Sequence, residues 1–96
     1  MYAVVRSYSG QGAWELFEQL EQRNEEVKDL IDGVPGFVSY TAFRSSEGGV
    51  TVTVCQDKAG TDESSRRAAE WVKEYISAMA NAPVITEGST VVQFNS

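Results

Sequence analysis

Apolar residues recur along this chain with two different spacings, which predict its strands and its helices. Four segments are rich in β-branched and aromatic side chains and are predicted to be strands: residues 2–8, 37–44, 50–56 and 90–94. Residues 13–32 instead carry apolar side chains at the i, i+3, i+4, i+7 spacing of one helix face. The same spacing predicts a second helix, which is capped by Thr61 or Asp62 and continues to about Met79.

The order of these elements is βαββαβ, which is typical of an α+β ferredoxin-like fold. The turn-rich residues 45–49 join the second and third strands into an antiparallel hairpin. We therefore expect one domain over residues 1–96, in which two helices cover one face of a four-stranded antiparallel sheet. The other sheet face has no cover within the chain, so we expect a second copy to cover it.

The composition limits the chemistry that is open to such a domain. The chain has 96 residues, no histidine and one cysteine. The missing histidine excludes Ser-His and Cys-His nucleophile pairs, histidine metal sites and histidine-ligated haem. The acidic run along the first helix has no calcium-loop spacing, so we predict no metal site and no bound cofactor.

The net charge of -6 argues against binding to nucleic acid or to an anionic membrane, because both need a cationic surface. The only basic cluster, Arg66-Arg67, is flanked by acidic residues. No apolar stretch approaches the roughly 20 residues of a membrane span, and no secretory signal is recognised. With a single cysteine that cannot form an internal disulfide, these features predict a cytoplasmic protein.

One segment suggests a family. Pro35-Gly36-Phe37-Val38-Ser39-Tyr40, followed by Arg44-Ser45, resembles the second-strand signature of the antibiotic biosynthesis monooxygenase-like proteins. The resemblance in element order covers residues 2–94. It implies a dimeric α+β barrel, in which two ferredoxin-like subunits pack sheet against sheet around a ligand cavity.

The resemblance also implies a range of activities. Some members oxidise polycyclic phenols with dioxygen and no cofactor, others degrade haem, and many have no known activity. The haem-degrading branch uses a histidine iron ligand, which this chain lacks. Many members follow the third strand with an acidic residue and a tryptophan, whereas this chain has Cys55-Gln56-Asp57-Lys58 and lacks that aromatic contribution.

Alternation along the strands selects candidate ligand-binding residues. We predict that Val50, Val52 and Val54 face the helices, and that the hairpin pairs Thr41 with Thr53. A slip of one residue would exchange the two faces. In the preferred register the open face, which lines the cavity in the family, carries the following candidates: Arg6, Tyr8, Ser39, Thr41, Thr51 and Thr53.

Several of these candidates have two interpretations. Arg6 pairs either with an anionic substrate or with a carboxylate of the second subunit. Tyr8 is either an acid and hydrogen-bond donor or an interface aromatic. Asn24 lies near the centre of the first helix's apolar stripe, where its amide either bonds to backbone or lines a cavity.

The tryptophans and the cysteine are also ambiguous. Trp14 and Trp71 lie at the edges of apolar stripes and serve either as packing residues or as ligand contacts, with Trp71 taken as a candidate. Cys55 has no histidine partner, which favours a buried thiol over a nucleophile.

Three functions are consistent with these residues. The first is a homodimeric α+β barrel that acts as a cofactor-independent monooxygenase on a small aromatic or polyketide-like molecule. The second is a non-catalytic small-molecule-binding or stress-related module of the same fold. The third is an assembly domain that uses only its sheet face. The sequence leaves catalysis itself undecided and identifies no catalytic residue.

Overall fold

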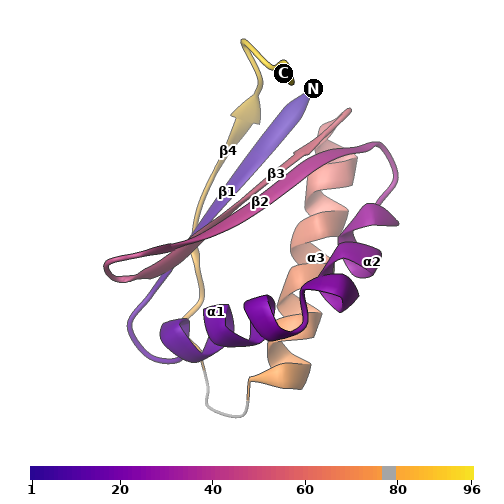
Figure 1. Cartoon of the computed structure of the whole chain (residues 1–96). Coiled ribbons are helices and arrows are strands. Elements are labelled where there is room, and N and C mark those ends of the chain that lie inside the picture. Colours follow the sequence, from indigo (N-terminus) through magenta and orange to yellow (C-terminus); the bar gives the residue numbers. More distant parts are fainter. Residues whose placement is uncertain (77–79) are drawn as a thin grey trace.

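A computed structural model describes residues 1–76 and 80–96. The chain forms four strands and three helices (Figure 1): β1 (Tyr2–Ser9), α1 (Ala13–Gln22), α2 (Asn24–Asp32), β2 (Phe37–Ser45), β3 (Gly48–Cys55), α3 (Lys58–Tyr75) and β4 (Val84–Ser89). The strands form one antiparallel sheet in the order β2-β3-β1-β4, and the helices lie against one of its faces (Figure 1). The predicted ferredoxin-like α+β fold is confirmed.

The tight β2–β3 hairpin depends on one glycine. Residues 46–47 form the turn, and Gly48 follows it with a φ of 154°. A Cβ at Gly48 would lie 2.4 Å from the carbonyl oxygen of Tyr8 and 2.6 Å from the Cβ of Ala13. Any side chain at this position would collide with β1 and α1. Glycine is therefore required for the hairpin to pack against the start of α1.

The first helix is not continuous, contrary to the prediction for residues 13–32. It breaks at Arg23, whose φ and ψ are -111° and 30°. The break falls where the apolar stripe is interrupted between Leu20 and Val27, so no buried side chain holds the intervening turn in register. α1 packs mainly on β3, whereas α2 packs on β2 and α3.

The second predicted helix begins earlier than expected, because its cap is Asp57 and not Thr61 or Asp62. Asp57 caps α3 by accepting a hydrogen bond of 3.0 Å from the backbone N–H of Gly60. Gly60 is buried against Cys55 and the Pro35 carbonyl oxygen, where a Cβ would have no room. The tight packing of this first turn therefore fixes the start of α3. Its C-terminal end is Tyr75, and the predicted end near Met79 lies outside the described residues.

The last strand was placed wrongly at residues 90–94. β4 instead pairs with β1 from Ser7 opposite Val84 to Tyr2 opposite Ser89. Ser89 lies opposite Tyr2, the first residue of β1. The N–H of Thr90 donates one more hydrogen bond, of 2.9 Å, to the carbonyl of Met1. The chain after Thr90 therefore leaves the sheet.

The hydrophobic core lies between the sheet and the helices. Its buried members come from β1, from all three helices and from Ile76 just after α3, with Tyr8 and Phe17 in an edge-to-face contact at 5.9 Å. None of the described helices is long and apolar enough to cross a membrane.

Candidate functional site

The predicted strand register was wrong by one residue, and the correction moves four candidate residues. Thr41 pairs with Val52, not with Thr53. Thr51 and Thr53 are buried beneath the helices, and so are Arg6 and Tyr8 of β1. The valines of β3 were expected to be the inward residues, but the hydroxyls lie inward because they accept hydrogen bonds from Arg6.

Arg6 lies at the centre of this inner polar cluster, with 1% of its surface exposed. Its Nη1 donates to the hydroxyls of Thr51 at 3.3 Å and Thr53 at 3.1 Å. Its Nη2 donates to Ser64 at 2.7 Å and Ser65 at 2.9 Å, and its Nε also donates to Ser65, at 3.2 Å. All five N–H bonds of the guanidinium can be satisfied by these four hydroxyls.

The charge of Arg6 has no anionic partner among the described residues, since every ion pair found there involves other residues. Burial lowers the pKa of the guanidinium from its ordinary value. An arginine nevertheless stays protonated in proteins, because its ordinary pKa lies far above neutrality. A positive charge therefore lies inside the domain, surrounded only by hydroxyl dipoles.

A small inner cavity lies beside this cluster. Its volume is about 20 Å³, which is room for about one water molecule. Polar and aromatic residues from four elements line it: Tyr8, Tyr40, Thr51 and Trp71. The remaining wall is aliphatic, and no described carboxylate or lysine reaches it.

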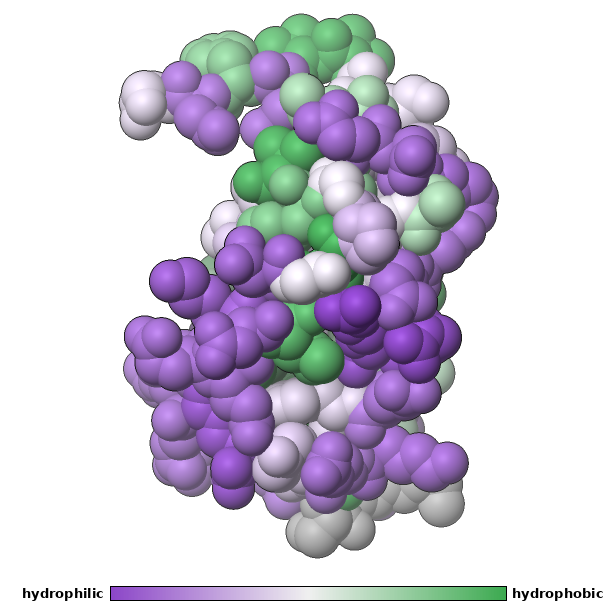
Figure 2. Space-filling view, turned by 90° about the vertical axis from the view of Figure 1, so that its right-hand side faces the viewer, coloured by the Kyte–Doolittle hydropathy of each residue, from purple (hydrophilic) through white to green (hydrophobic). Residues whose placement is uncertain are grey.

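A larger outer cleft lies between α1, α2 and the edge strand β2, with a volume of about 610 Å³. Its wall is mostly apolar, and it shares Leu20, Val27, Ile31 and Tyr40 with the inner cavity. Figure 2 shows hydrophobic residues in a narrow strip bordered by hydrophilic ones on one side of the molecule. The two spaces are separated only by these shared side chains, so a ligand in the cleft would contact Tyr40 directly.

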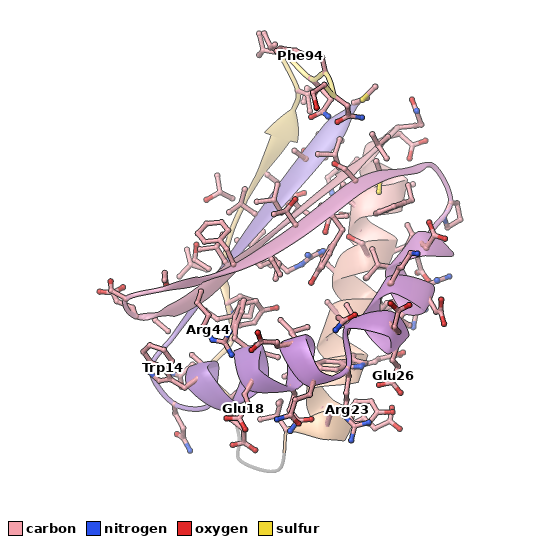
Figure 3. The ribbon with its side chains drawn as sticks, viewed as in Figure 1. Trp14, Glu18, Arg23, Glu26, Arg44 and Phe94 are labelled. Carbon is pink, nitrogen blue, oxygen red and sulfur yellow. The ribbon has the colours of Figure 1, made fainter. Side chains whose placement is uncertain are left out.

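Charged residues line the outer end of the cleft. Arg44 extends from β2 toward α1 (Figure 3), where its Nη2 lies 2.9 Å from the Glu21 carboxylate. Lys28 and Asp32 also line the cleft, so the charges of its two acidic and two basic residues balance. The cleft thus offers an apolar interior behind a mouth with no net charge.

Both tyrosines of the inner cavity remain protonated at neutral pH. Burial raises the pKa of Tyr40 to about 12 and also raises that of Tyr8, although the positive charge of Arg6 acts in the opposite direction on each. No hydrogen bond joins either hydroxyl to another side chain or backbone group in residues 1–76 and 80–96. Both hydroxyls are therefore available as donors to a bound group.

The remaining predicted candidates do not all line the same space. Asn24 and Ser39 line the outer cleft. The amide of Asn24 is exposed, not buried as expected, and it donates to the Glu21 carbonyl at 2.8 Å. Thr41 lies on the open sheet face, as predicted, and does not line the cleft.

The two tryptophans differ in their surroundings. Trp71 is buried, lines the inner cavity and donates from its indole N–H to Glu26 at 3.3 Å. Trp14 projects from the start of α1 (Figure 3) and is 58% exposed, which contradicts its predicted place at the edge of the core.

Sequence reasoning missed Tyr40, which lines both the inner cavity and the outer cleft, and the α3 hydroxyls of Ser64 and Ser65, which accept hydrogen bonds from Arg6. Two adjacent serines that a helix directs toward a buried arginine are the signal that a buried polar partner is required. Among the described residues, no cluster of histidine, cysteine and acidic side chains could hold a metal ion.

The whole chain resembles solved structures. The monooxygenase ActVA-Orf6 of Streptomyces coelicolor, solved with nanaomycin D, matches over 99% of this chain and 91% of its own, with a TM-score of 0.69 and 18% identity. The chain has the fold of the antibiotic biosynthesis monooxygenase-like proteins. The family resemblance suggested by residues 35–40 is thus confirmed at the level of the fold.

Other structures with this fold have different descriptions. SnoaB, a cofactor-independent oxygenase from Streptomyces nogalater, matches over 97% of this chain and 94% of its own, with a TM-score of 0.60 and 19% identity. NE2512 of Nitrosomonas europaea, a protein of unknown function, matches over 99% and 92%, with a TM-score of 0.68 and 15% identity. No family model and no curated protein matches the sequence.

Proposed function

We propose that this protein binds a small aromatic or polyketide-like molecule in the outer cleft and oxygenates it with dioxygen without a cofactor. The observation that carries this proposal is the cleft itself, an apolar space of about 610 Å³ that ends at the Tyr40 side chain. Ligand sites are commonly concave and apolar, with a few polar groups that orient the ligand. The fold shared with two oxygenases is consistent with this proposal.

The proposed reaction needs no cofactor and no reductant from the protein. In the oxidation of a phenol to a quinone by dioxygen, the substrate's own C–H and O–H bonds supply the electrons. One oxygen atom becomes a carbonyl of the product and the other leaves as water, so no added reductant is needed. The protein would orient the substrate, exclude water and favour its ionised form.

Nanaomycin D and oxygen uptake together test this proposal. We expect nanaomycin D to bind, as measured by isothermal titration calorimetry, and phenolic polycyclic substrates to consume dioxygen in the presence of the protein. Ala42→Trp would fill the cleft from β2, and we expect it to reduce both signals at least tenfold. Ser46→Trp, in the exposed β2–β3 turn outside the cleft, is the matched control. Unchanged binding in Ala42→Trp would refute the cleft as the site.

A second candidate function, binding without catalysis, is favoured by the chemistry of the inner wall. The described lining of the inner cavity has no carboxylate, lysine or thiol, and burial raises the pKa of both of its tyrosines. No group there is poised to remove a proton at neutral pH. Ligand binding without oxygen uptake would establish this function instead.

We also propose that the protein is a homodimer, with the open sheet face covered by a second copy. Apolar side chains gather on this face from all four strands, including Val5, Phe43, Val52 and Val84. Beyond β4, Val91 and Phe94 are 96% and 82% exposed. Hydrophobic residues also gather at the upper end of the molecule (Figure 2), where Figure 1 places both termini. Exposed apolar residues in this number are typical of an interface.

A further inference from the structure

We propose that Arg6 acts as a buried positioning charge, which makes the inner end of the cleft selective for an anionic oxygen on the ligand. This inference rests on the proposed binding function and specifies the ligand as one that carries an ionisable hydroxyl or a carboxylate. Arg6 does not touch the ligand. It acts through the hydroxyl of Thr51 and through its field at Tyr8 and Tyr40.

The first step is the orientation of the Thr51 hydroxyl. Its oxygen accepts a hydrogen bond from Arg6 at 3.3 Å, and the same residue lines the inner cavity. A hydroxyl that accepts from a guanidinium keeps its own hydrogen for donation. Thr51 can therefore present a donor to the cavity, polarised by the charge behind it.

The second step concerns the two tyrosine hydroxyls. Tyr8 is only 7% exposed, yet its hydroxyl has no hydrogen-bond partner in the described part of the chain. Tyr40 borders both the inner cavity and the outer cleft. Tyr8, Tyr40 and Thr51 line a space of about 20 Å³ whose wall is mainly apolar, and of these three residues Tyr40 also lines the cleft, so its phenol is the donor nearest to a ligand bound there.

The third step is the balance of charge. The titratable groups that interact electrostatically with Arg6 are Tyr8 of β1, Tyr40 of β2 and Cys55 of β3. All three are neutral at neutral pH, because burial raises the pKa of each. From α3, only the hydroxyls of Ser64 and Ser65 contact the guanidinium. Its positive charge is thus left for a ligand to neutralise.

The net charge of the chain is -6, so long-range attraction cannot account for the binding of an anion. Selection has to be local, at low dielectric, where one uncompensated charge has its largest effect. An opposite charge a few ångströms from a titrating group commonly lowers the pKa of an acid by about one to three units. We expect a bound phenol to ionise about one unit lower than in water, which is about tenfold tighter binding of its anion.

The test uses 4-nitrophenol, whose ionised form is yellow, and its methyl ether 4-nitroanisole, which cannot ionise. The absorbance of 4-nitrophenol is titrated against pH with and without the protein, and the affinity of both probes is measured by isothermal titration calorimetry. We expect the bound phenol to titrate about one unit lower, and the anion to bind about tenfold more tightly than the ether.

Substitutions assign this preference to Arg6. In Arg6→Gln the shift should disappear while 4-nitroanisole still binds, and in Arg6→Lys most of the shift should return. Arg66→Gln removes an exposed charge from the outer surface of α3 and should leave the shift unchanged. If Arg6→Gln does not fold, Thr51→Val with Thr51→Ser as its rescue keeps the charge and removes only the donor. We expect Thr51→Val to weaken binding of the anion about tenfold.

The outcomes separate this inference from the proposed function. Equal binding of both probes, with no shift in the titration of 4-nitrophenol, would overturn the role of Arg6 while leaving the ligand cleft in place. An unchanged shift in both Arg6→Gln and Thr51→Val would overturn it as well. Failure of both probes to bind would remove the cleft as a ligand site, and the inference with it.

Discussion

Tyr40 lies between the outer cleft and the inner cavity and lines both of them. Its aromatic ring forms part of both walls, and its hydroxyl lies in the field of Arg6. The burial that makes Tyr40 a good hydrogen-bond donor also makes its ionised form unfavourable.

This burial predicts how the stability of the protein depends on pH. Since the pKa of Tyr40 is raised from 10.0 to about 12, the folded protein holds this proton more tightly than the unfolded chain. The free energy of unfolding should therefore be unaffected by Tyr40 below pH 10 and should fall as the pH rises from 10 to 12. The loss due to this group amounts to about 2 to 3 kcal/mol.

Urea unfolding of the native protein and of Tyr40→Phe, measured at several alkaline pH values, isolates this effect. The phenylalanine variant has no proton to lose at this position, so its stability should decline less steeply. If the free energy of unfolding fell equally steeply with pH in both proteins, the ionisation of Tyr40 would not be the cause of the loss.

The residue scale also shows where sequence reasoning reached its limit. Alternation in β3 correctly divided the valines from the threonines, but it did not show which set faces the helices. The choice depends on Arg6, a residue of the neighbouring strand whose five donors require buried hydroxyls. Because the opposite face is also apolar, hydrophobicity alone could not decide the register.

At the scale of elements, close contact between α1 and β3 depends on the absence of a side chain at Gly49. A Cβ there would lie 2.4 Å from two ring atoms of Phe17. The ring also contacts Tyr8 edge to face. Phe17 is thus held between β3 and β1, which fixes the distance of α1 from the sheet.

Gly49→Ala should therefore lower the free energy of unfolding by about 1 to 3 kcal/mol, because the ring must move within a packed core. Chemical denaturation measures the change. Gly88→Ala in β4 is the control, since a Cβ at that position meets nothing within 4 Å. An equal loss in both variants would indicate a general effect of glycine replacement and not a collision with Phe17.

The elements themselves were predicted more reliably than their ends. Periodicity predicts a four-stranded antiparallel sheet with helices on one face, and this architecture is confirmed, although the first predicted helix is two helices and the last strand is Val84–Ser89. The break at Arg23 and the position of β4 could not be predicted, because both depend on contacts between distant segments. Val84 joins β4 since it lies opposite Ser7, whereas Val91 has similar local propensity but no partner strand.

At the scale of the whole molecule, the two faces of the sheet differ. One face carries the helices, the cleft and the buried charge, and the other is the face of the proposed dimer interface. This division differs from the expectation that the ligand cavity lies on the open face. The cleft on the helix side can therefore be studied separately from assembly.

Assembly can be tested with one charge on the open face. Static light scattering at micromolar concentration should give the native protein a mass of two 10.5 kDa chains. Val52→Asp places a carboxylate in the proposed interface and should yield a monomer, because a buried unpaired charge is strongly unfavourable. Ala69→Asp adds the same charge on the exposed side of α3 and should leave the mass unchanged. A monomeric native protein would refute the dimer.

The burial of Cys55 has a consequence for kinetics. The thiol is 0% exposed and is covered by the first turn of α3 at Gly60. A thiol reagent can modify it only in molecules where this turn has separated from β3, so the modification rate counts opening events. Since the sequence has no other cysteine, the rate of thiol modification measures local unfolding at the start of α3. This measurement needs no introduced label.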